Sequence, residues 1–219
     1  MNAVLAPMAV VVLLLLLQVV CCVGQLGPTP LFPPEWPANF QVEFHEAAWY
    51  FFSITTTGKM YYDAAHNRSR TDRVDGKGNR YCGTIYPLRN TACTQLVVDG
   101  MRYIFFPEHK YCCSCCSAEA GCGILRRDWL HGAQYLGQEE VEGQMCNKWK
   151  QAGLQNNYFW ETLDGVPLQI YMEPNEKITF RTETYAEEEI NASLFELPPW
   201  GCEKACTGLC SVPGARGIS

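Results

Sequence analysis

Positive charge is scarce in this sequence and does not cluster. The 219 residues include 17 Lys and Arg against 23 Asp and Glu, which gives a net charge of −6 at pH 7. Proteins that bind DNA or RNA neutralise phosphates with grouped basic side chains, and this chain contains no run of them. We therefore expect no nucleic-acid partner.

The sequence also lacks the motifs of several large enzyme classes. It has no G-x-S-x-G elbow, no H-E-x-x-H zinc motif, no P-loop and no dinucleotide-binding glycine fingerprint. The D-x-D pair that many metal-dependent glycosyltransferases use is missing, because Asp72 and Asp75 in "DRVD" are spaced differently. The four histidines do not cluster in the sequence. These absences favour a protein with no cofactor and no catalytic residues, and an enzyme of unfamiliar type remains the alternative.

Charged residues are absent from positions 1–24. The apolar run 9–17 is followed by a small-residue exit at 22–24, a layout typical of a secretory signal peptide cleaved after Gly24. The alternative is a membrane anchor, but the run is shorter than the roughly 20 residues that a spanning helix needs. No later segment is apolar enough to span a bilayer. We expect a secreted or lumenal protein without a stable membrane anchor.

Cysteine, in contrast, is abundant. Two of the 13 cysteines lie in the predicted signal peptide, and five of the remaining eleven fall within the stretch "KYCCSCCSAEAGC", residues 110–122. The C-x-x-C spacings in this stretch match half of a zinc site, and the three cysteines of the C-terminal tail offer a second half. An oxidising lumen favours disulfides over both zinc and redox roles. We therefore predict no metal.

Adjacent cysteines do not easily bond to each other, so Cys112 and Cys113 need different partners, as do Cys115 and Cys116. We predict that this stretch is a hub that joins the 82–93 segment, the entry to a predicted helix and the C-terminal tail. Eleven is an odd number, so one cysteine stays free or links two chains in a dimer. The predicted disulfide cysteines, one of them unpaired, are Cys82, Cys93, Cys112, Cys113, Cys115, Cys116, Cys122, Cys146, Cys202, Cys206 and Cys210.

The rest of the chain has the pattern of successive β-hairpins. In "TQLVVDGMRYIFF" the two-residue turn Asp99-Gly100 sets Val98 opposite Met101 and Leu96 opposite Tyr103, and this apolar face is predicted to point inward. In "NYFWETLDGVPLQIYM" the same logic sets Phe159 opposite Ile170. The one segment with a clear helical pattern is "RRDWLHGAQYL", where Asp128 could cap a short helix.

These signals predict a mainly β fold: a curved antiparallel sheet, or half-barrel, with one or two short helices packed over it and disulfides stapling it. The predicted organisation is a signal peptide (1–24), a proline-rich lead-in (25–38), a half-barrel (39–201) and a cysteine-containing tail (202–219).

Residues 121–151, "GCGILRRDWLHGAQYLGQEEVEGQMCNKWKQ", carry a resemblance. They are similar to a family of uncharacterised secreted plant and protist proteins that are sometimes labelled glycosyltransferase-like. The matching residues are Gly123, Ile124, Leu125, Trp129, Leu130, Ala133, Tyr135, Leu136, Gly137, Gly143, Cys146 and Trp149.

The stretches "YFWETLDGVPL" and "FELPPWGC" resemble ependymin-related proteins, which share the half-barrel of bacterial lipoprotein carriers such as LolA. This resemblance implies a curved sheet closed by helices over an apolar cavity that binds acyl chains. It implies no catalytic residue, because the matched residues look structural.

We therefore expect a secreted protein that binds a hydrophobic or amphipathic ligand, such as a lipid or an acyl chain. The predicted pocket lining is Leu96, Tyr103, Phe105, Phe159, Ile170 and Phe180. The alternatives are a glycan-handling enzyme, which paired carboxylates in a cleft would favour, and an extracellular interaction protein, which an exposed thiol would favour. Two sequons predict glycosylation at Asn67 and Asn191.

Overall fold

The computed structural model describes residues 29–30, 32–49, 53–153 and 155–211. The predicted signal peptide, the start of the lead-in and the end of the tail lie outside these residues. The chain divides into two compact units, residues 1–30 and 31–219, and the fold below belongs to the second. None of the helices in the described ranges has both the length and the apolar character needed to cross a bilayer.

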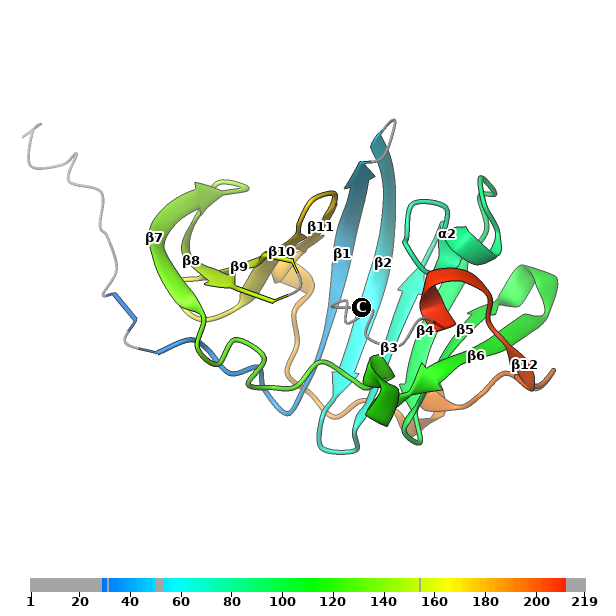
Figure 1. Ribbon diagram of the computed structural model, residues 1–219. Helices are drawn as coiled ribbons and strands as arrows, with labels where there is room; N and C mark the ends of the chain where they lie inside the picture. Colours follow the sequence, from blue (N-terminus) through cyan, green and yellow to red (C-terminus); the bar gives the residue numbers. More distant parts are fainter. Residues whose placement is uncertain (1–28, 31, 50–52, 154, 212–219) are drawn as a thin grey trace, which may run out of the picture. The chain divides into compact units, whose positions relative to one another are not determined.

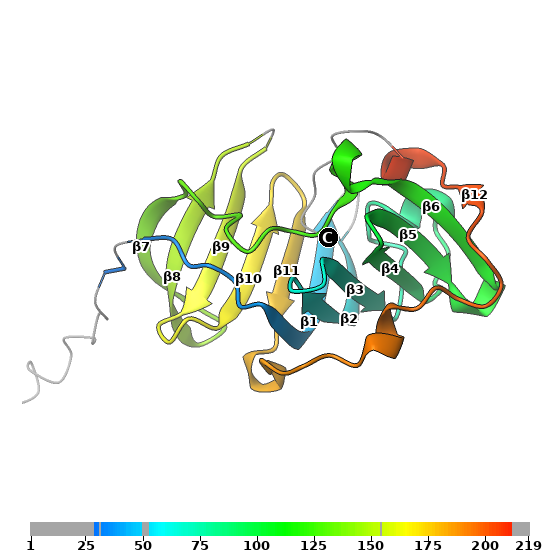
Figure 2. The same cartoon turned by 90° about the horizontal axis from the view of Figure 1, so that it is seen from below.

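One twelve-stranded sheet forms the framework of this unit (Figure 1). Its spatial order is β12-β6-β5-β4-β3-β2-β1-β11-β10-β9-β8-β7, so two meanders lie side by side and join where β11 pairs with β1 (Figure 2). The strands are β1 (Asn39–Trp49), β2 (Ser53–Asp63), β3 (Arg68–Arg73), β4 (Cys93–Val98), β5 (Met101–Phe106), β6 (Tyr111–Ser117), β7 (Gln134–Val141), β8 (Gln144–Gln151), β9 (Asn157–Thr162), β10 (Pro167–Met172), β11 (Glu176–Phe180) and β12 (Lys204–Ala205).

Helical structure is limited to short turns among the described residues. They are α2 (Cys82–Ile85), the π-helical turn η2 (Ala118–Cys122) and the 3₁₀ turns η1 (Pro107–His109), η3 (Thr182–Thr184), η4 (Ala192–Phe195) and η5 (Gly208–Ser211). The predicted fold class, a mainly β, curved, disulfide-containing sheet with short helices, is confirmed.

The predicted hairpin registers are also confirmed. Val98 pairs with Met101, Leu96 with Tyr103, and Phe159 with Ile170. Asp99 and Gly100 have φ values of 51° and 71°, the two left-handed conformations that a type I′ turn requires. Because this turn has only two residues, it fixes the register of both strands.

Alternate residues of β1 point to opposite sides of the sheet. We call the side that carries Phe40, Val42 and Phe44 the Phe44 face, and the side that carries His45 and Ala47 the His45 face. Directly paired residues share a face, so the ladder extends each name across the sheet.

The ladder corrects one prediction, that the apolar face of the 95–105 hairpin points toward the same interior as Phe159. Phe44 pairs with Gly58, Gly58 with Arg73, and Arg73 with Cys93. Leu96, three residues beyond Cys93, therefore points to the His45 face. The turn determines which residues share a face, but only pairing over long sequence distances determines which side of the sheet that face occupies.

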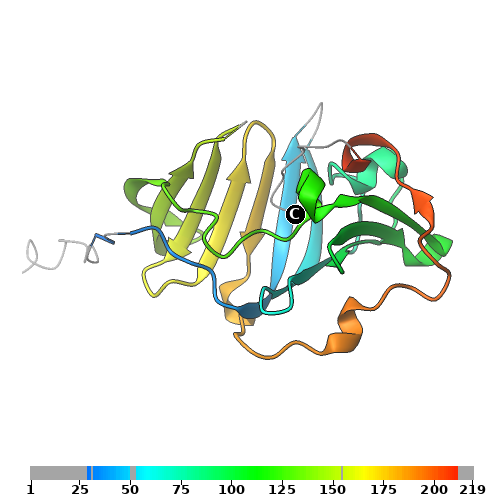
Figure 3. The ribbon, with the colours of Figure 1, turned by 60° about the horizontal axis from the view of Figure 1, so that its bottom comes forward.

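The Phe44 face is covered by two segments that are not helices. One is the described part of the lead-in, residues 32–38, and the other is a strap, residues 123–133, that leads from η2 to β7. Both cross the strands of the second meander on the same side (Figures 2 and 3).

The predicted helix over the strap is wrong. Successive turns close instead, through bonds from Trp129 N to Arg126 O, from His131 N to Asp128 O and from Ala133 N to Leu130 O. The Asp128 carboxylate binds the Arg126 side chain at 2.7 Å and caps no helix. Gly132 has a φ of 79°, which an α-helix does not accommodate.

The disulfides tie the tail to the edge strand β6. Neighbouring residues of a strand point to opposite faces, so Cys112 and Cys113 reach partners on opposite sides of the sheet. The tail therefore passes around the edge, and β12 pairs with β6 there. Three bridges join β6 to the tail, Cys112–Cys202, Cys113–Cys206 and Cys115–Cys210, and a fourth, Cys116–Cys122, joins β6 to η2.

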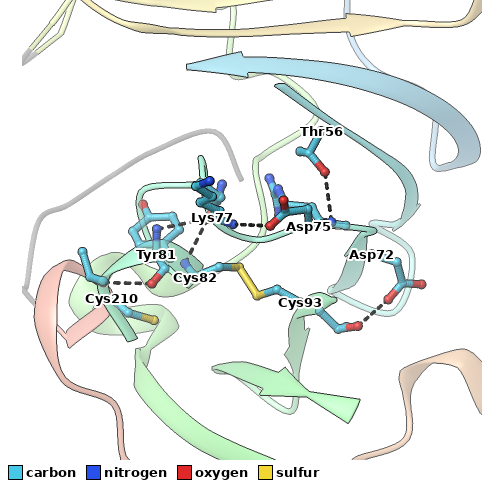
Figure 4. Close-up of a disulfide and its surroundings, with 12 residues drawn as sticks. Thr56, Asp72, Asp75, Lys77, Tyr81, Cys82, Cys93 and Cys210 are labelled. Atoms are coloured by element: carbon cyan, nitrogen blue, oxygen red, sulfur yellow. Dashed lines mark hydrogen bonds between the residues drawn. A yellow bond between two sulfur atoms is a disulfide. The ribbon is translucent and has the colours of Figure 1, made fainter. Parts of the chain in front are cut away.

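The hub prediction fails for the 82–93 segment, because Cys82 bonds to Cys93 (Figure 4). Both residues lie on one loop-and-strand segment, between α2 and the start of β4, and can meet without the hub. Cys146 is the free cysteine among the described residues, and its side chain is buried.

These pairings predict the non-reducing tryptic map. Peptide 111–126 should migrate linked to both 182–204 and 205–216, while 81–89 should be linked only to 90–102. Mass spectrometry before and after reduction checks this result. A link from Cys82 or Cys93 to peptide 111–126 would contradict the structure.

Candidate ligand-binding site

An aromatic-rich cluster fills the space between the Phe44 face and its cover. Trp36 of the lead-in packs edge-on against Phe40, Tyr62 and Trp129, with ring centroids 5.1, 5.3 and 5.9 Å apart. The buried members are Trp36, Phe40, Val42, Phe44, Met60, Tyr62, Leu130, Trp149, Phe159, Ile170, Met172, Ile178 and Phe180.

Few polar contacts hold the cover in place. Trp36 N donates to Arg127 O at 3.0 Å, and Arg127 Nε donates back to Trp36 O at 2.7 Å, so the lead-in and the strap bind each other. Tyr62 OH donates to Leu125 O at 2.7 Å, and burial raises the pKa of Tyr62 to about 12. The remaining contact with the sheet is mainly apolar. These contacts lie outside the strand ladder.

The indole N–H groups of Trp36 and Trp129 are buried and have no hydrogen-bond partner among the described residues. Buried donors in folded proteins are nearly always paired, and an unpaired one costs free energy. The cluster therefore contains two donors that a polar atom of water or ligand could pair with.

A polar network occupies the end of the Phe44 face near Trp49. Arg73 Nε donates to Glu46 Oε2 at 2.5 Å, and Asn79 Nδ2 donates to Glu46 Oε1 at 3.0 Å. Arg80 Nε donates to Glu176 Oε2 at 2.6 Å. Asn79 and Arg80 come from the loop before α2, which is held by bonds from Asp75 N to Thr56 Oγ1 and from Lys77 N to Asp75 Oδ1 (Figure 4).

The two carboxyl groups of this network are in different protonation states. Burial opposes ionisation of Glu46, but the charge of Arg73 and hydrogen bonds from its neighbours outweigh this and lower the pKa of Glu46. Burial and the adjacent Glu46 carboxylate raise the pKa of Glu176 to about 7, against the charge of Arg80. The adjacent carboxylate thus favours the protonated form of Glu176, and the pair holds one proton below about pH 7.

The structure places the six predicted pocket residues in two separate clusters. Phe159, Ile170 and Phe180 belong to the cluster on the Phe44 face. The other three pack on the His45 face beneath Ile190 and Phe195, with Leu96 and Phe105 buried and Tyr103 partly exposed.

The His45 face carries an open groove where the first meander meets the second. It consists of two adjoining depressions with volumes of about 680 and 480 Å³. Its lining is mostly polar and charged and includes residues that no motif indicated, among them His45, Thr57, Asp75, Lys177 and Arg181.

Sequence reasoning missed the buried polar side chains of the Phe44 face. A signal was present for one of them, because Glu46 continues the alternation of Phe40, Val42 and Phe44 in "FQVEFHE" and is therefore in phase with the buried positions. No such signal marks Trp36 as a core residue, since it lies in a proline-rich stretch.

The two sequon asparagines, Asn67 and Asn191, are exposed, at the β2–β3 turn and the start of η4. Their glycosylation stays a prediction.

Comparison with known families gives one match. The family described as "Domain of unknown function (DUF8395)" matches residues 35–193. The chain belongs to the DUF8395 family. The DUF8395 region begins beside Trp36 and ends within η4, so it contains the strap and eleven of the twelve strands but none of the three tail cysteines. No protein of curated function matches the sequence.

Solved structures resemble the DUF8395 fold at low sequence identity. An uncharacterized conserved protein from Thermus thermophilus is 7% identical, covers 77% of this chain and 90% of its own, and has a TM-score of 0.50. This likeness shows a common fold.

Two further structures match at a TM-score of 0.34 and 8% identity. A LolA superfamily protein from Nitrosomonas europaea covers 74% of this chain and 92% of its own. A putative outer membrane lipoprotein-sorting protein domain from Vibrio parahaemolyticus covers 72% and 89%. A LolA-superfamily protein is thus among the structural neighbours. The likeness to ependymin-related and to plant and protist proteins stays a prediction.

The raised pKa of Glu176 predicts a pH-dependent stability. The folded state holds this proton up to about pH 7, whereas an unfolded Glu loses it near pH 4.5, so this contribution to stability is full below pH 4.5 and disappears as pH rises through 7. The loss is on the order of 3 kcal/mol. Glu46 stays ionised across this window and adds no slope.

Glu176→Gln mimics the protonated side chain and should flatten the dependence of Tm on pH between 5 and 8, with a higher Tm than wild type at pH 8. Thermal unfolding followed by circular dichroism measures this. Glu189→Gln, at an exposed position, is the control. Parallel Tm curves for wild type and Glu176→Gln would contradict the assignment.

Proposed function

We propose that the protein binds a hydrophobic or amphipathic ligand, such as a lipid or an acyl chain, between the Phe44 face and its cover. The observation that carries the proposal is the cover itself: two segments that are neither helix nor strand, joined to each other and to Tyr62 by a few hydrogen bonds, lie over an aromatic-rich apolar surface. Apolar surfaces lined with aromatic side chains and a few polar groups are typical of sites for small apolar molecules.

A ligand at this place would displace side chains of the cover. Trp36 and Trp129 are the large groups that the cover inserts into the cluster, and they pack edge-on against sheet residues that a ligand would contact. Of the pocket lining predicted from sequence, Phe159, Ile170 and Phe180 belong to this proposed site. Leu96, Tyr103 and Phe105 would face a ligand only on the His45 face.

A secreted or lumenal location fits the proposal. Five disulfides are typical of proteins that fold in an oxidising compartment. The predicted signal peptide leads to the same inference.

The alternative of a glycan-handling enzyme draws support from the Glu46–Glu176 pair, whose pKa values move apart as those of an acid and a base do. The burial of the pair argues against this alternative, because a substrate could not reach the two carboxyl groups. Glu46 and Glu176 are 2% and 3% exposed, and both accept hydrogen bonds from neighbouring side chains. We therefore assign the pair a structural role and not a catalytic one.

The alternative of an interaction protein linked through its odd cysteine gains no support from the free thiol. Cys146 is buried, and burial raises its pKa to about 11, so the reactive thiolate is scarce. A disulfide-linked dimer would have to use a cysteine that is bridged here.

Quenching of tryptophan fluorescence by a dibrominated stearic acid tests the proposed site. Three of the six tryptophans lie in the cluster, so bound ligand should quench up to half of the emission, while unbrominated stearic acid should not. Trp129→Phe should reduce the quenched fraction.

Trp200→Phe serves as the matched control, because Trp200 packs on the His45 face. It should leave the amount of quenched emission unchanged, so that the quenched fraction does not fall. Loss of quenching in Trp200→Phe but not in Trp129→Phe would place the ligand on the other face, and absence of quenching in wild type would reject lipid binding.

A further inference from the structure

Three buried polar side chains form a diagonal row on the Phe44 face, across β3, β4 and β5. Gln95 pairs with Thr71 and with Ile104, Arg73 lies two residues beyond Thr71, and Arg102 lies two residues before Ile104. Diagonal neighbours on one face are about 7–8 Å apart. Gln95 is therefore a diagonal neighbour of Arg102 on one side and of Arg73 on the other, and the Arg73 side chain is turned toward Glu46 on β1.

Six polar atoms of this row have no hydrogen-bond partner among the described residues. They are both terminal nitrogens of Arg73, both amide atoms of Gln95, and Nε and Nη1 of Arg102. Each of the three residues is 2% exposed. Unpaired polar atoms at this depth are rare, and several in one place indicate a missing partner.

Charge identifies the kind of partner. Arg73 already faces the carboxylate of Glu46. Arg102 forms no salt bridge with any residue that the structure describes. Its neighbours are the carbonyl oxygen of Gly123, at 3.3 Å from Nη2, and the ring of Tyr81, at 5.3 Å from Cζ.

A buried cation without a counterion is costly, because desolvation of the charge is not offset by a nearby opposite charge. Burial lowers the pKa of Arg102, and the charge interaction and side-chain hydrogen bond with Tyr81 oppose this shift without outweighing it. The guanidinium is too basic to lose its proton in response, so a counterion is the remaining way to offset the cost.

We propose that Arg102 and Gln95 bind an anionic oxygen group, a carboxylate or a phosphate. Guanidinium groups bind both through paired N–H donors, and the Gln95 amide adds a further donor.

The position of this row relates the anion to the proposed lipid site, on which this part of the inference rests. Arg102 lies in line with Val97, Ser69 and Tyr62 along the ladder, about 14 Å from Tyr62 at the usual spacing of strands. Arg102 and Tyr62 both donate to the start of the strap, at Gly123 and Leu125. The ligand class is therefore an acyl chain with an anionic head group, with the chain under the cover and the head group at Arg102.

Chain-matched probes test this assignment. Wild type should bind stearic acid at least tenfold more tightly than stearyl alcohol, as expected when a charged hydrogen-bonded pair is lost. Arg102→Met should weaken binding of the acid to the level of the alcohol and leave the alcohol unchanged. Native mass spectrometry or displacement of the dibrominated acid measures both affinities.

Three further measurements complete the design. Arg102→Lys keeps the charge and should retain part of the preference for the acid, which also covers the case in which the Met variant does not fold. Arg70→Met removes an arginine of strand β3 that points to the His45 face, and should leave the affinities for acid and alcohol unchanged. Without ligand, Arg102→Met should melt at a higher temperature than wild type, because an uncompensated charge has been removed.

The outcomes separate the two proposals. Equal binding of acid and alcohol by wild type, unchanged in Arg102→Met, overturns the anion site and leaves lipid binding intact. Binding of neither probe overturns both. If inorganic phosphate alone raises the Tm of wild type but not of Arg102→Met, while neither chain binds, the anion site stands and the amphipathic ligand is rejected.

Discussion

The pairing of β11 with β1 is the contact on which the rest of the structure depends. It joins Phe180 to Phe44 across most of the chain length and turns two separate meanders into one sheet. The apolar cluster needs it, because Ile178 and Phe180 complete the surface that β1 begins. The carboxylate pair needs it too: Ala48 pairs with Glu176 and Glu46 with Ile178, which places the two acids diagonally on one face.

Local patterns were sufficient to predict the hairpins, because a two-residue turn such as Asp99-Gly100 determines register and shared faces without help from the rest of the chain. They were not sufficient to assign each hairpin's apolar face to one side of the sheet. Leu96 and Phe159 lie in equally regular strands, yet they end on opposite sides, and the tail segment with Phe195 covers one while the strap covers the other. The prediction of a helix in the strap was wrong, because its apolar residues match helical spacing but the segment folds as successive turns that lie across the sheet.

Strand geometry was sufficient to predict part of the disulfide pattern. Adjacent cysteines on β6 must face opposite sides, and the tail that reaches both must pass around the sheet edge. This arrangement covers an edge strand whose free N–H and C=O groups would otherwise invite pairing with another chain. The identity of the free cysteine could not be read in this way. Cys146 lies on β8, in the second meander, where the sheet brings no other cysteine of the described residues near it.

The Phe44 face has two groups of buried polar side chains, and they differ in whether the fold supplies their partners. In the first, Glu46 and Glu176 receive donors from Arg73, Asn79 and Arg80, so each charge has a partner within the fold. In the second, Arg102 and Gln95 are as deeply buried but lack such partners among the described residues. Apolar residues at those two positions would fit the surrounding face at no cost in unpaired groups. A chain that keeps arginine and glutamine there carries a cost that folding alone does not explain, and a bound anion is the partner whose charge and hydrogen-bonding capacity match what is missing.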